Sequence, residues 1–345
     1  MPPMQKNIAC APKRSTSVLS NTNIYARHYH KETAATDYGI PLITKDLVDQ
    51  TYTRATVAEV YKQIEDDLKE ASKSLKEVPI NLFHPYLGSL HSFYARLYLY
   101  MGRYDDALTE AKEALKLNDQ LQDLRPYQTK DKTTWGRIVL PDGTPMLEKD
   151  DNPEAVFVRL QSGRVTIPVS KDFLATFERN LPAGATDQRR ALFYADDTVN
   201  MGRTDYFYGE TCYILYAYQN VGFSTVENML IAAECEARVG SKDNAMSYVN
   251  KLRDNRIKNN VALTATDKDE ALRIVLDERR REFAFTGFHR LIDLKRLNYE
   301  DKFKKTVTHT ADGETFTLAP NDNRYIFPIN QMILNYNPGM PQYER

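Results

Sequence analysis

Aromatic residues with polar neighbours mark the segments of this chain that could bind a hydroxylated ligand. Trp135, the single tryptophan, lies in a polar, turn-rich segment, and Tyr206 and Tyr208 closely follow Arg203. A sugar ring has an apolar C–H face and a rim of hydroxyl groups, so it is bound by an exposed aromatic ring beside amide, carboxylate or guanidinium groups. The candidate ligand-binding residues are therefore Trp135, Arg203, Tyr206 and Tyr208. The structural alternatives are a loop anchor for the tryptophan and ordinary packing for the tyrosines.

Adjacent aspartates are the residues to test for hydrolytic chemistry. Among the adjacent pairs are Asp66–Asp67, Asp150–Asp151 and Asp196–Asp197. Neighbours along a chain point apart, so adjacency alone does not place two carboxyl groups across one scissile bond. The six histidines form no HExxH motif, and the glycines form neither a phosphate-binding loop nor a nucleophile elbow. We expect a protein that is not an enzyme and that uses no cofactor and no metal ion.

Residues 277–297 carry the densest charge pattern in the chain. The apolar periodicity predicts a helix, a corner at Gly287 and a second short helix. The arginines at 279–281 would suggest phosphate or nucleic-acid binding only as part of a wider basic surface. Glu278 and Glu282 flank them, and the whole chain has 46 basic and 47 acidic residues. We therefore interpret the segment as framework held by ion pairs within it, and we expect no nucleic-acid ligand.

Two helical hairpins must position the aromatic segments. Small residues recur in both at steps of seven, five and seven: Ala95, Gly102, Ala107 and Ala114 in the first, and Ala233, Gly240, Ala245 and Leu252 in the second. This spacing is typical of tetratricopeptide units, which serve as architecture or as a peptide-binding face. A further amphipathic helix is predicted over residues 56–77, where Thr56 and Glu59 can form a capping box.

The predicted fold is mainly α-helical, with tetratricopeptide-like repeats and an irregular, loop-rich insert. The repeats lie at about 56–118 and 226–297, and the insert, expected to bind the ligand, lies at about 119–225. Short strands are predicted in it at residues 137–140, 155–158 and 164–167. Residues 1–36 have no sustained apolar period and are predicted to be a poorly structured lead-in, followed by one domain at 37–345.

Composition fits a globular protein, with 42% hydrophobic and 27% charged residues. No stretch reaches the length of about 18 apolar residues that a membrane span needs, and the N-terminus lacks the apolar region of a signal peptide. The cysteines, Cys10, Cys212 and Cys235, are far apart, which indicates neither a zinc site nor a disulfide framework. Cys235 is expected to be a small buried helix residue.

The segment at 278–296 resembles a pattern found near the C-terminus of the SusD/RagB family of outer-membrane nutrient-binding lipoproteins, E-R-R-x-E-[FL]-x-[FL]-E-G-x-R-[WF]-x-D-L-x-R. The matching positions are Glu278, Arg279, Arg280, Glu282, Phe283, Phe285, Gly287, Asp293, Leu294 and Arg296. The chain departs from the pattern at Thr286, where the family has glutamate, and at His289–Leu291.

Other segments resemble landmarks of the same family in the same order along the chain. They are the run from Tyr38 to Leu75, the NPExIF-like residues 152–157, the DxR-like residues 187–190, the start of the second repeat at 223–227, and the ending at 326–338. The resemblance covers about residues 37–340. Family members are usually longer and begin with a lipoprotein signal, so we expect this chain to lack an N-terminal portion.

The resemblance implies a SusD-like protein of polysaccharide utilization in a Bacteroidetes-type cell. Such a protein captures oligosaccharides at the outer membrane, facing outward, and delivers them to a SusC-like TonB-dependent transporter. Its only link to the membrane is a lipid anchor on the full precursor. The alternatives are a RagB-like importer component that binds peptides, a cytosolic tetratricopeptide adaptor, and a helical glycoside hydrolase. The missing signal peptide favours the adaptor, and the C-terminal pattern disfavours it.

Overall fold

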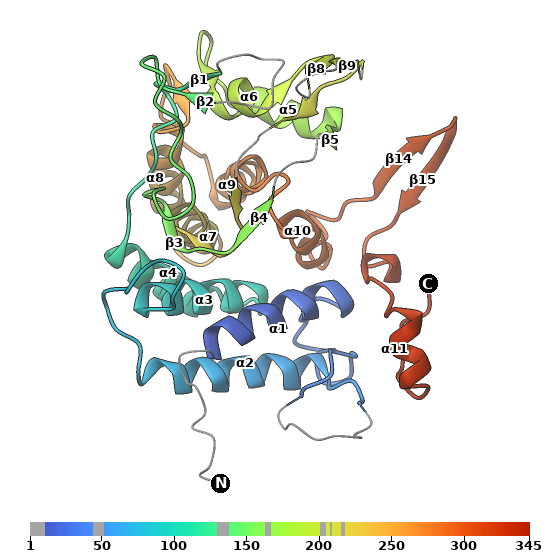
Figure 1. Ribbon diagram of the computed structural model, residues 1–345. Helices are drawn as coiled ribbons and strands as arrows, with labels where there is room; N and C mark the ends of the chain where they lie inside the picture. Colours follow the sequence, from blue (N-terminus) through green and yellow to red (C-terminus); the bar gives the residue numbers. More distant parts are fainter. Residues whose placement is uncertain are drawn as a thin grey trace. The chain divides into compact units, whose positions relative to one another are not determined.

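The computed structural model (Figure 1) is mainly helical, with short antiparallel strand pairs, which confirms the predicted fold class. It describes residues 11–43, 52–129, 138–162, 167–200, 205–207, 209–214 and 218–345. The chain forms two compact units. The first comprises Met1–Lys76, Tyr100–Gly102 and Phe288–Arg345, and the second comprises Glu77–Leu99 and Arg103–Gly287.

Helix α7 is the centre of the second unit. The principal helices of this unit are α3 (Leu87–Tyr100, without its last residue), α4 (Tyr104–Leu117), α7 (Thr225–Arg238), α8 (Lys242–Arg253) and α9 (Lys268–Glu282). Helices α4, α8 and α9 all pack on α7, and every α7 residue from Thr225 to Ala237 is buried. A helix that is covered on every side can anchor a core from several directions.

Both predicted helical hairpins are present. Gly102, between α3 and α4, has φ +71°, a conformation in which a side chain would be strained. Gly240, between α7 and α8, lies so close to Glu236 that an added Cβ would be 2.0 Å from its Oε2 atom. Ala107 and Ala245 have no exposed surface, so the small residues do lie in the packed faces.

The insert contains two short helices, α5 (Lys171–Glu178) and α6 (Gln188–Phe193). Its strands are β1 (Gln128–Thr129), β2 (Ile138–Val139), β3 (Ala155–Phe157), β4 (Leu160–Ser162), β5 (Ile167–Pro168), β6 (Thr186–Asp187), β7 (Tyr194–Ala195), β8 (Thr198–Asn200), β9 (Asp205–Phe207), β10 (Cys212–Tyr213), β11 (Tyr218–Asn220) and β12 (Phe223–Ser224). The predicted strands at 137–140 and 155–158 are confirmed as β2 and β3. Of the third, residues 164–166 lie outside the described residues, and β5 begins at Ile167.

The strand pairs fold the insert back on itself. All the described pairs are antiparallel: β1 with β2, β5 and β7 with β10, β4 with β11, β3 with β12, β8 with β9, and β6 with β13 (Ile257–Lys258), which follows α8. Within this frame the core is aromatic. The Phe285 ring stacks on Tyr213 at 4.6 Å between ring centres, and Phe173 packs edge-on against Phe177 at 5.3 Å. The insert is therefore held to the segment that follows α9.

The first unit contains α1 (Ala11–Tyr25) alongside α2 (Val57–Ser72), as Figure 1 shows. Its other elements are α10 (His289–Leu297), the hairpin of β14 (Val307–Ala311) and β15 (Glu314–Leu318), a short 3-10 helix η2 (Asn323–Tyr325) and α11 (Gln331–Tyr336). The predicted capping box is confirmed at the start of α2. The Thr56 hydroxyl accepts from the Glu59 amide, and the Glu59 carboxylate accepts from the Thr56 amide at 2.8 Å.

Residues 11–25 of the lead-in, which was predicted to be poorly structured over residues 1–36, form helix α1, and residues 1–10 lie outside the described residues. The sequence of α1 is rich in serine, threonine and asparagine, which are weak helix formers. The polar side chains bond back to the helix instead, as Asn23 Nδ2 does to the Leu19 carbonyl at 2.9 Å. Leu19 is buried, so packing rather than intrinsic propensity stabilises this helix. Such a helix has no regular apolar period in its sequence.

Asp293 pairs with Arg296 within the 277–297 segment at 2.8 Å, as predicted, but Glu278 and Glu282 find most of their partners outside it. Glu278 has no exposed surface, and its carboxylate lies 2.6 Å from Arg189 of α6, 2.6 Å from Arg281 and 3.5 Å from Arg253 of α8. Burial opposes the charge, but these guanidinium groups lower the pKa of Glu278 far below its ordinary value. The segment serves as framework, as interpreted, but it holds distant parts of the chain together.

Candidate functional site

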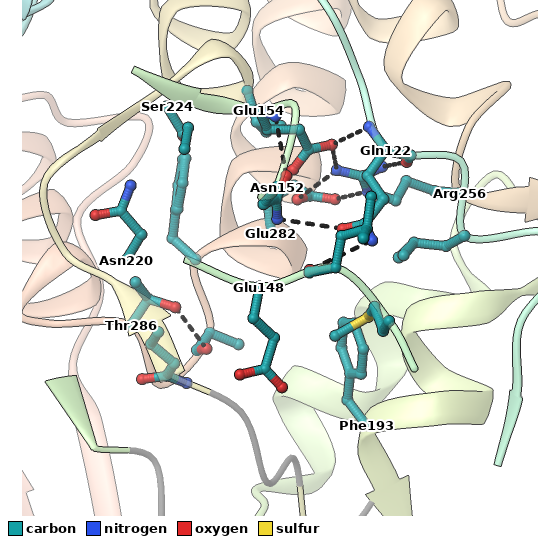
Figure 2. A pocket seen from close by; sticks show the side chains of 18 of the residues that line it. Gln122, Glu148, Asn152, Glu154, Phe193, Asn220, Ser224, Arg256, Glu282 and Thr286 are labelled. Atoms are coloured by element: carbon teal, nitrogen blue, oxygen red, sulfur yellow. Dashed lines mark hydrogen bonds and ion pairs between the residues drawn. The ribbon is translucent and has the colours of Figure 1, made fainter. Parts of the chain in front are cut away.

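A cavity of about 180 Å³ opens in the second unit, where the insert meets the start of α7 and the segment after α9. Figure 2 shows the side chains around it. The labelled residues come from six parts of the chain: Gln122, then Glu148 with Asn152 and Glu154, then Phe193, then Asn220 with Ser224, then Arg256, and last Glu282 with Thr286. Since these parts are far apart in sequence, the folded unit alone brings them together.

Arg256 organises one wall of the cavity. Its guanidinium group donates to the Gln122 carbonyl at 2.7 Å, to Glu154 at 2.6 Å and to Glu282 at 2.7 Å. Figure 2 shows these bonds as one connected network. Because every edge of the guanidinium group is occupied by protein oxygens, this wall is a rigid support rather than a group that waits for an anionic ligand.

The two carboxylates on Arg256 have different surroundings. Burial raises the pKa of Glu154, although the guanidinium group lies beside it. Burial has the same tendency at Glu282, but there Arg256 and Arg189 together outweigh it and lower the pKa. Since both carboxylates are engaged by Arg256, they are poorly placed to act as a free acid and base.

The cavity also presents amide and hydroxyl groups. Asn152 donates through Nδ2 to Gln122 at 3.2 Å and accepts the Glu154 amide at 2.9 Å. Asn220 donates through Nδ2 to the Phe223 carbonyl at 3.2 Å. A carboxamide nitrogen carries two N–H groups, so one on each asparagine is left for a ligand. The Thr286 hydroxyl makes only a long bond, 3.5 Å, to the Ala284 carbonyl.

A carboxylate and an aromatic ring complete the site. Figure 2 shows the Glu148 side chain between Thr286 and the half-buried ring of Phe193. Hydroxyl groups of a sugar can donate to a carboxylate and accept from amides, and the C–H face of a sugar packs on an aromatic ring. The cavity therefore has the combination of groups that we sought in the sequence, but it is made by other residues.

The structure does not test the sequence candidates. Trp135, Arg203 and Tyr208 lie outside the described residues, and for Tyr206 only the backbone in β9 is described, paired with Val199. All four stay predictions. Sequence reasoning missed Gln122, Asn152, Asn220 and Thr286 as cavity residues. A usable signal was present at Thr286, where the chain departs from the SusD/RagB pattern, and at Asn152, which begins the NPExIF-like segment.

Two of the aspartate pairs make ordinary contacts with neighbouring side chains. Asp66 pairs with Lys62 of its own helix at 2.7 Å, and Asp67 accepts from Gln63 at 2.8 Å. Asp196 accepts from Arg190 at 2.7 Å and from Thr211. These are helix-surface and loop contacts, as interpreted from the sequence.

Metal ligands, thiols and membrane-spanning helices are considered next for the part of the chain that the structure describes. It contains no group of three histidine, cysteine or acidic side chains that could hold a metal ion. Cys212 and Cys235 are buried and form no disulfide, and burial was expected for Cys235, whereas Cys10 lies outside the described residues. None of the helices described is long and apolar enough to cross a membrane.

Two sequence families match this chain. Residues 226–345 match a family model described as the SusD family, and residues 19–99 match one described as starch-binding associating with outer membrane. A search of curated proteins found no match.

Solved structures share the fold over almost the whole chain. A SusD superfamily protein from Bacteroides thetaiotaomicron has a TM-score of 0.72 at 19% identity, covering 98% of this chain and 77% of that one. A SusD-like carbohydrate binding protein from Bacteroides vulgatus has a TM-score of 0.67 at 18% identity, covering 98% and 78%. A SusD-like protein from Bacteroides fragilis has a TM-score of 0.67 at 15% identity, covering 97% and 78%. At such identities the neighbours establish the fold.

The matched segments contain the C-terminal pattern and the Tyr38–Leu75 run that carried the resemblance. Together with the shared fold, these matches show that the chain belongs to the SusD/RagB family.

Proposed function

We propose that this protein binds oligosaccharides at the outer membrane, without catalysing their breakdown, and delivers them to a SusC-like TonB-dependent transporter. It faces the outside of the cell and is held by a lipid anchor on the full precursor. Family membership supports a binding role, and the description of the model that matches residues 19–99, starch-binding associating with outer membrane, supports the ligand class and the location.

The observation that carries the proposal is the cavity between Glu148, Phe193 and the two asparagines, Asn152 and Asn220. It offers amide donors, a carboxylate acceptor and an aromatic ring. Its two buried guanidinium groups are already neutralised, Arg256 by Glu154 and Glu282, and Arg281 by Glu278. A neutral ligand rich in hydroxyl groups fits this set better than a charged one. The candidates Trp135, Arg203, Tyr206 and Tyr208 extend the same proposal to the rest of the insert.

Calorimetric titration with a panel of neutral oligosaccharides tests the ligand class. We expect Glu148→Gln and Thr286→Val to weaken binding of the preferred glycan by about tenfold each. The first replaces a charged acceptor oxygen with an NH2 donor, and the second removes a hydroxyl group. Glu178→Gln, outside the cavity, is the matched control and should bind as the wild type does. A protein that binds no glycan but binds peptides would sink the proposal in favour of the RagB-like alternative.

Co-purification from the native host tests the partner. We expect a TonB-dependent transporter to be recovered with the tagged protein from detergent-solubilised outer membranes. Recovery in the cytosolic fraction with peptide-bearing partners would favour the tetratricopeptide adaptor. Turnover of any glycan that is lost on changing a single acid would favour the glycoside hydrolase.

A further inference from the structure

A second cavity, of about 220 Å³, lies within the first unit and belongs to a different set of elements from the proposed glycan site. Its walls include residues from the segment that follows α1, from α10 and from η2. The side chains that matter most are His28, Thr33, Lys295, Asn298 and Tyr325. Four of them have almost no exposed surface: His28 4%, Lys295 5%, Asn298 0% and Tyr325 4%.

Lys295 brings a buried positive charge to this cavity. Its Nζ atom donates to the carbonyls of Asn23 and Ala26, each at 2.5 Å, at the C-terminal end of α1. Both partners are carbonyl oxygens, and among the described residues no carboxylate lies within ion-pair distance of Nζ. Burial therefore lowers the pKa of Lys295 to about 7. An anion beside the ammonium group would stabilise its charged form.

The other charged side chains at this cavity already have partners. Arg27 lies 3.1 Å from Asp37 and also donates to Asn323 at 3.0 Å. Asp322 is paired with Arg324 at 2.7 Å. With these pairs balanced, the ammonium group of Lys295 is the charge that the surrounding protein leaves uncompensated.

Unpartnered hydrogen-bonding atoms surround the same space. They are Asn298 Nδ2, Tyr325 Oη, Thr33 Oγ1 and His28 Nδ1. The Asn298 side-chain oxygen already accepts the Lys305 amide at 3.1 Å, so only N–H donors remain on that side chain. Buried donors without a partner are costly and are rare in folded proteins. Their gathering around one cavity indicates a missing ligand.

His28 adds one acceptor to this set of donors. Burial lowers the pKa of its imidazole to about 3, so the ring is neutral. The ring bonds to the Tyr100 backbone, and Nδ1 is the nitrogen without a partner. In a neutral ring whose other nitrogen donates to a carbonyl, Nδ1 carries the lone pair.

We propose that this cavity binds a small oxyanion that also carries an O–H group, such as hydrogen phosphate or a hydroxycarboxylate. Lys295 supplies the countercharge, Asn298 and Tyr325 donate to the anionic oxygens, and His28 accepts from the ligand hydroxyl. This site does not depend on the proposed glycan site, because the two cavities share no residue.

Calorimetric titration of the full chain at about pH 6, where Lys295 is charged, tests the assignment. The four probes are phosphate, glycolate, sulfate and acetate. Phosphate or glycolate should bind, and sulfate and acetate should bind several-fold more weakly because they have no O–H group for His28. Phosphate and glycolate also separate the inorganic source of the ligand from the organic one.

Two variants connect binding to the cavity. Lys295→Met should weaken binding at least about tenfold, and Tyr325→Phe should weaken it about five- to tenfold, because each removes a direct donor. The matched controls are Lys304→Met and Tyr336→Phe, at exposed positions of the same unit. They should bind as the wild type does.

Tyr325→Phe removes only a hydroxyl group without a protein partner, so it decides the question if Lys295→Met does not fold. The proposal is overturned if the wild type binds none of the four probes at about 10 mM. It is overturned equally if Tyr325→Phe binds phosphate and glycolate as tightly as the wild type. In either case the cavity is a water-filled space.

Discussion

Replacing Glu278 with glutamine removes one negative charge from a buried ionic cluster while the side chain keeps its shape. The cluster joins four carboxylates and four guanidinium groups: Glu154, Asp187, Glu278 and Glu282 with Arg189, Arg253, Arg256 and Arg281. Three of these guanidinium groups contact Glu278 directly. In the variant, four positive charges face three negative ones with little water to screen them.

Breaking a buried ion pair by removing one partner costs about 3–5 kcal/mol, because it leaves an uncompensated charge. In a protein of this size, about 1 kcal/mol corresponds to roughly 2–4 °C in Tm. We therefore expect Glu278→Gln to lower the Tm by about 6–20 °C in differential scanning calorimetry. Glu314→Gln, in the exposed hairpin strand β15, makes the same chemical change and should shift stability by no more than about 0.5 kcal/mol.

The dependence of the free energy of unfolding on pH, measured at acid pH, gives a second test. The folded-state pKa of Glu278 lies below its unfolded value of 4.5. Its contribution is therefore fully present above about pH 4.5 and is lost as the pH falls toward the folded pKa. The variant should lack this part of the acid sensitivity. A Tm within about 2 °C of the wild type, with an unchanged dependence on pH at acid pH, would refute the reasoning about this cluster.

Three further predictions concern single positions. Thr56→Ala should lower the free energy of urea unfolding by about 1 kcal/mol because α2 loses its cap. Thr56→Ser keeps a hydroxyl group and should retain most of that stability. Equal stability of the two variants would contradict the role of the cap. Gly240→Ala should lower the free energy of unfolding by about 1–3 kcal/mol, because the new Cβ atom would displace the Glu236 carboxylate from the Ser241 amide. An unchanged free energy of urea unfolding would show that the turn accommodates the Cβ atom without loss. The pKa of Lys295 is about 7 in the folded protein and 10.5 in the unfolded chain. Above about pH 7 the unfolded chain therefore binds more protons than the folded protein does. The free energy of unfolding should rise there by about 1.4 kcal/mol per pH unit. Lys295→Met should flatten that rise between about pH 7 and pH 9, and an identical slope in both proteins would disprove the role of Lys295.

The sequence was informative where the structure depends on neighbours along the chain. The steps between small residues identified both helical hairpins, and Thr56 with Glu59 identified the start of α2. Helix caps and helix periods are set within a few residues, so a single sequence contains them. The same reasoning failed at α1, where packing on α2 decides the structure.

Contacts between distant segments could not be predicted in this way. Arg189, Arg253 and Arg256 carry no local sign that they bind Glu278 and Glu282. Likewise, the candidate glycan cavity requires six parts of the chain to meet, and only the fold determines which amides face Phe193. Local patterns therefore predicted the elements, but not the surfaces that the elements create together.

Arg256 also determines the order in which the second unit can fold. Its partners are Gln122 and Glu154 before it and Glu282 after it, with sequence separations of 134, 102 and 26 residues. Helices in an ordinary tetratricopeptide array contact only their neighbours, so such an array can fold piece by piece. Here a chain that has been synthesised only as far as α8 would still lack the carboxylates of α9. We expect the second unit to fold late and all at once, after its last helix has emerged.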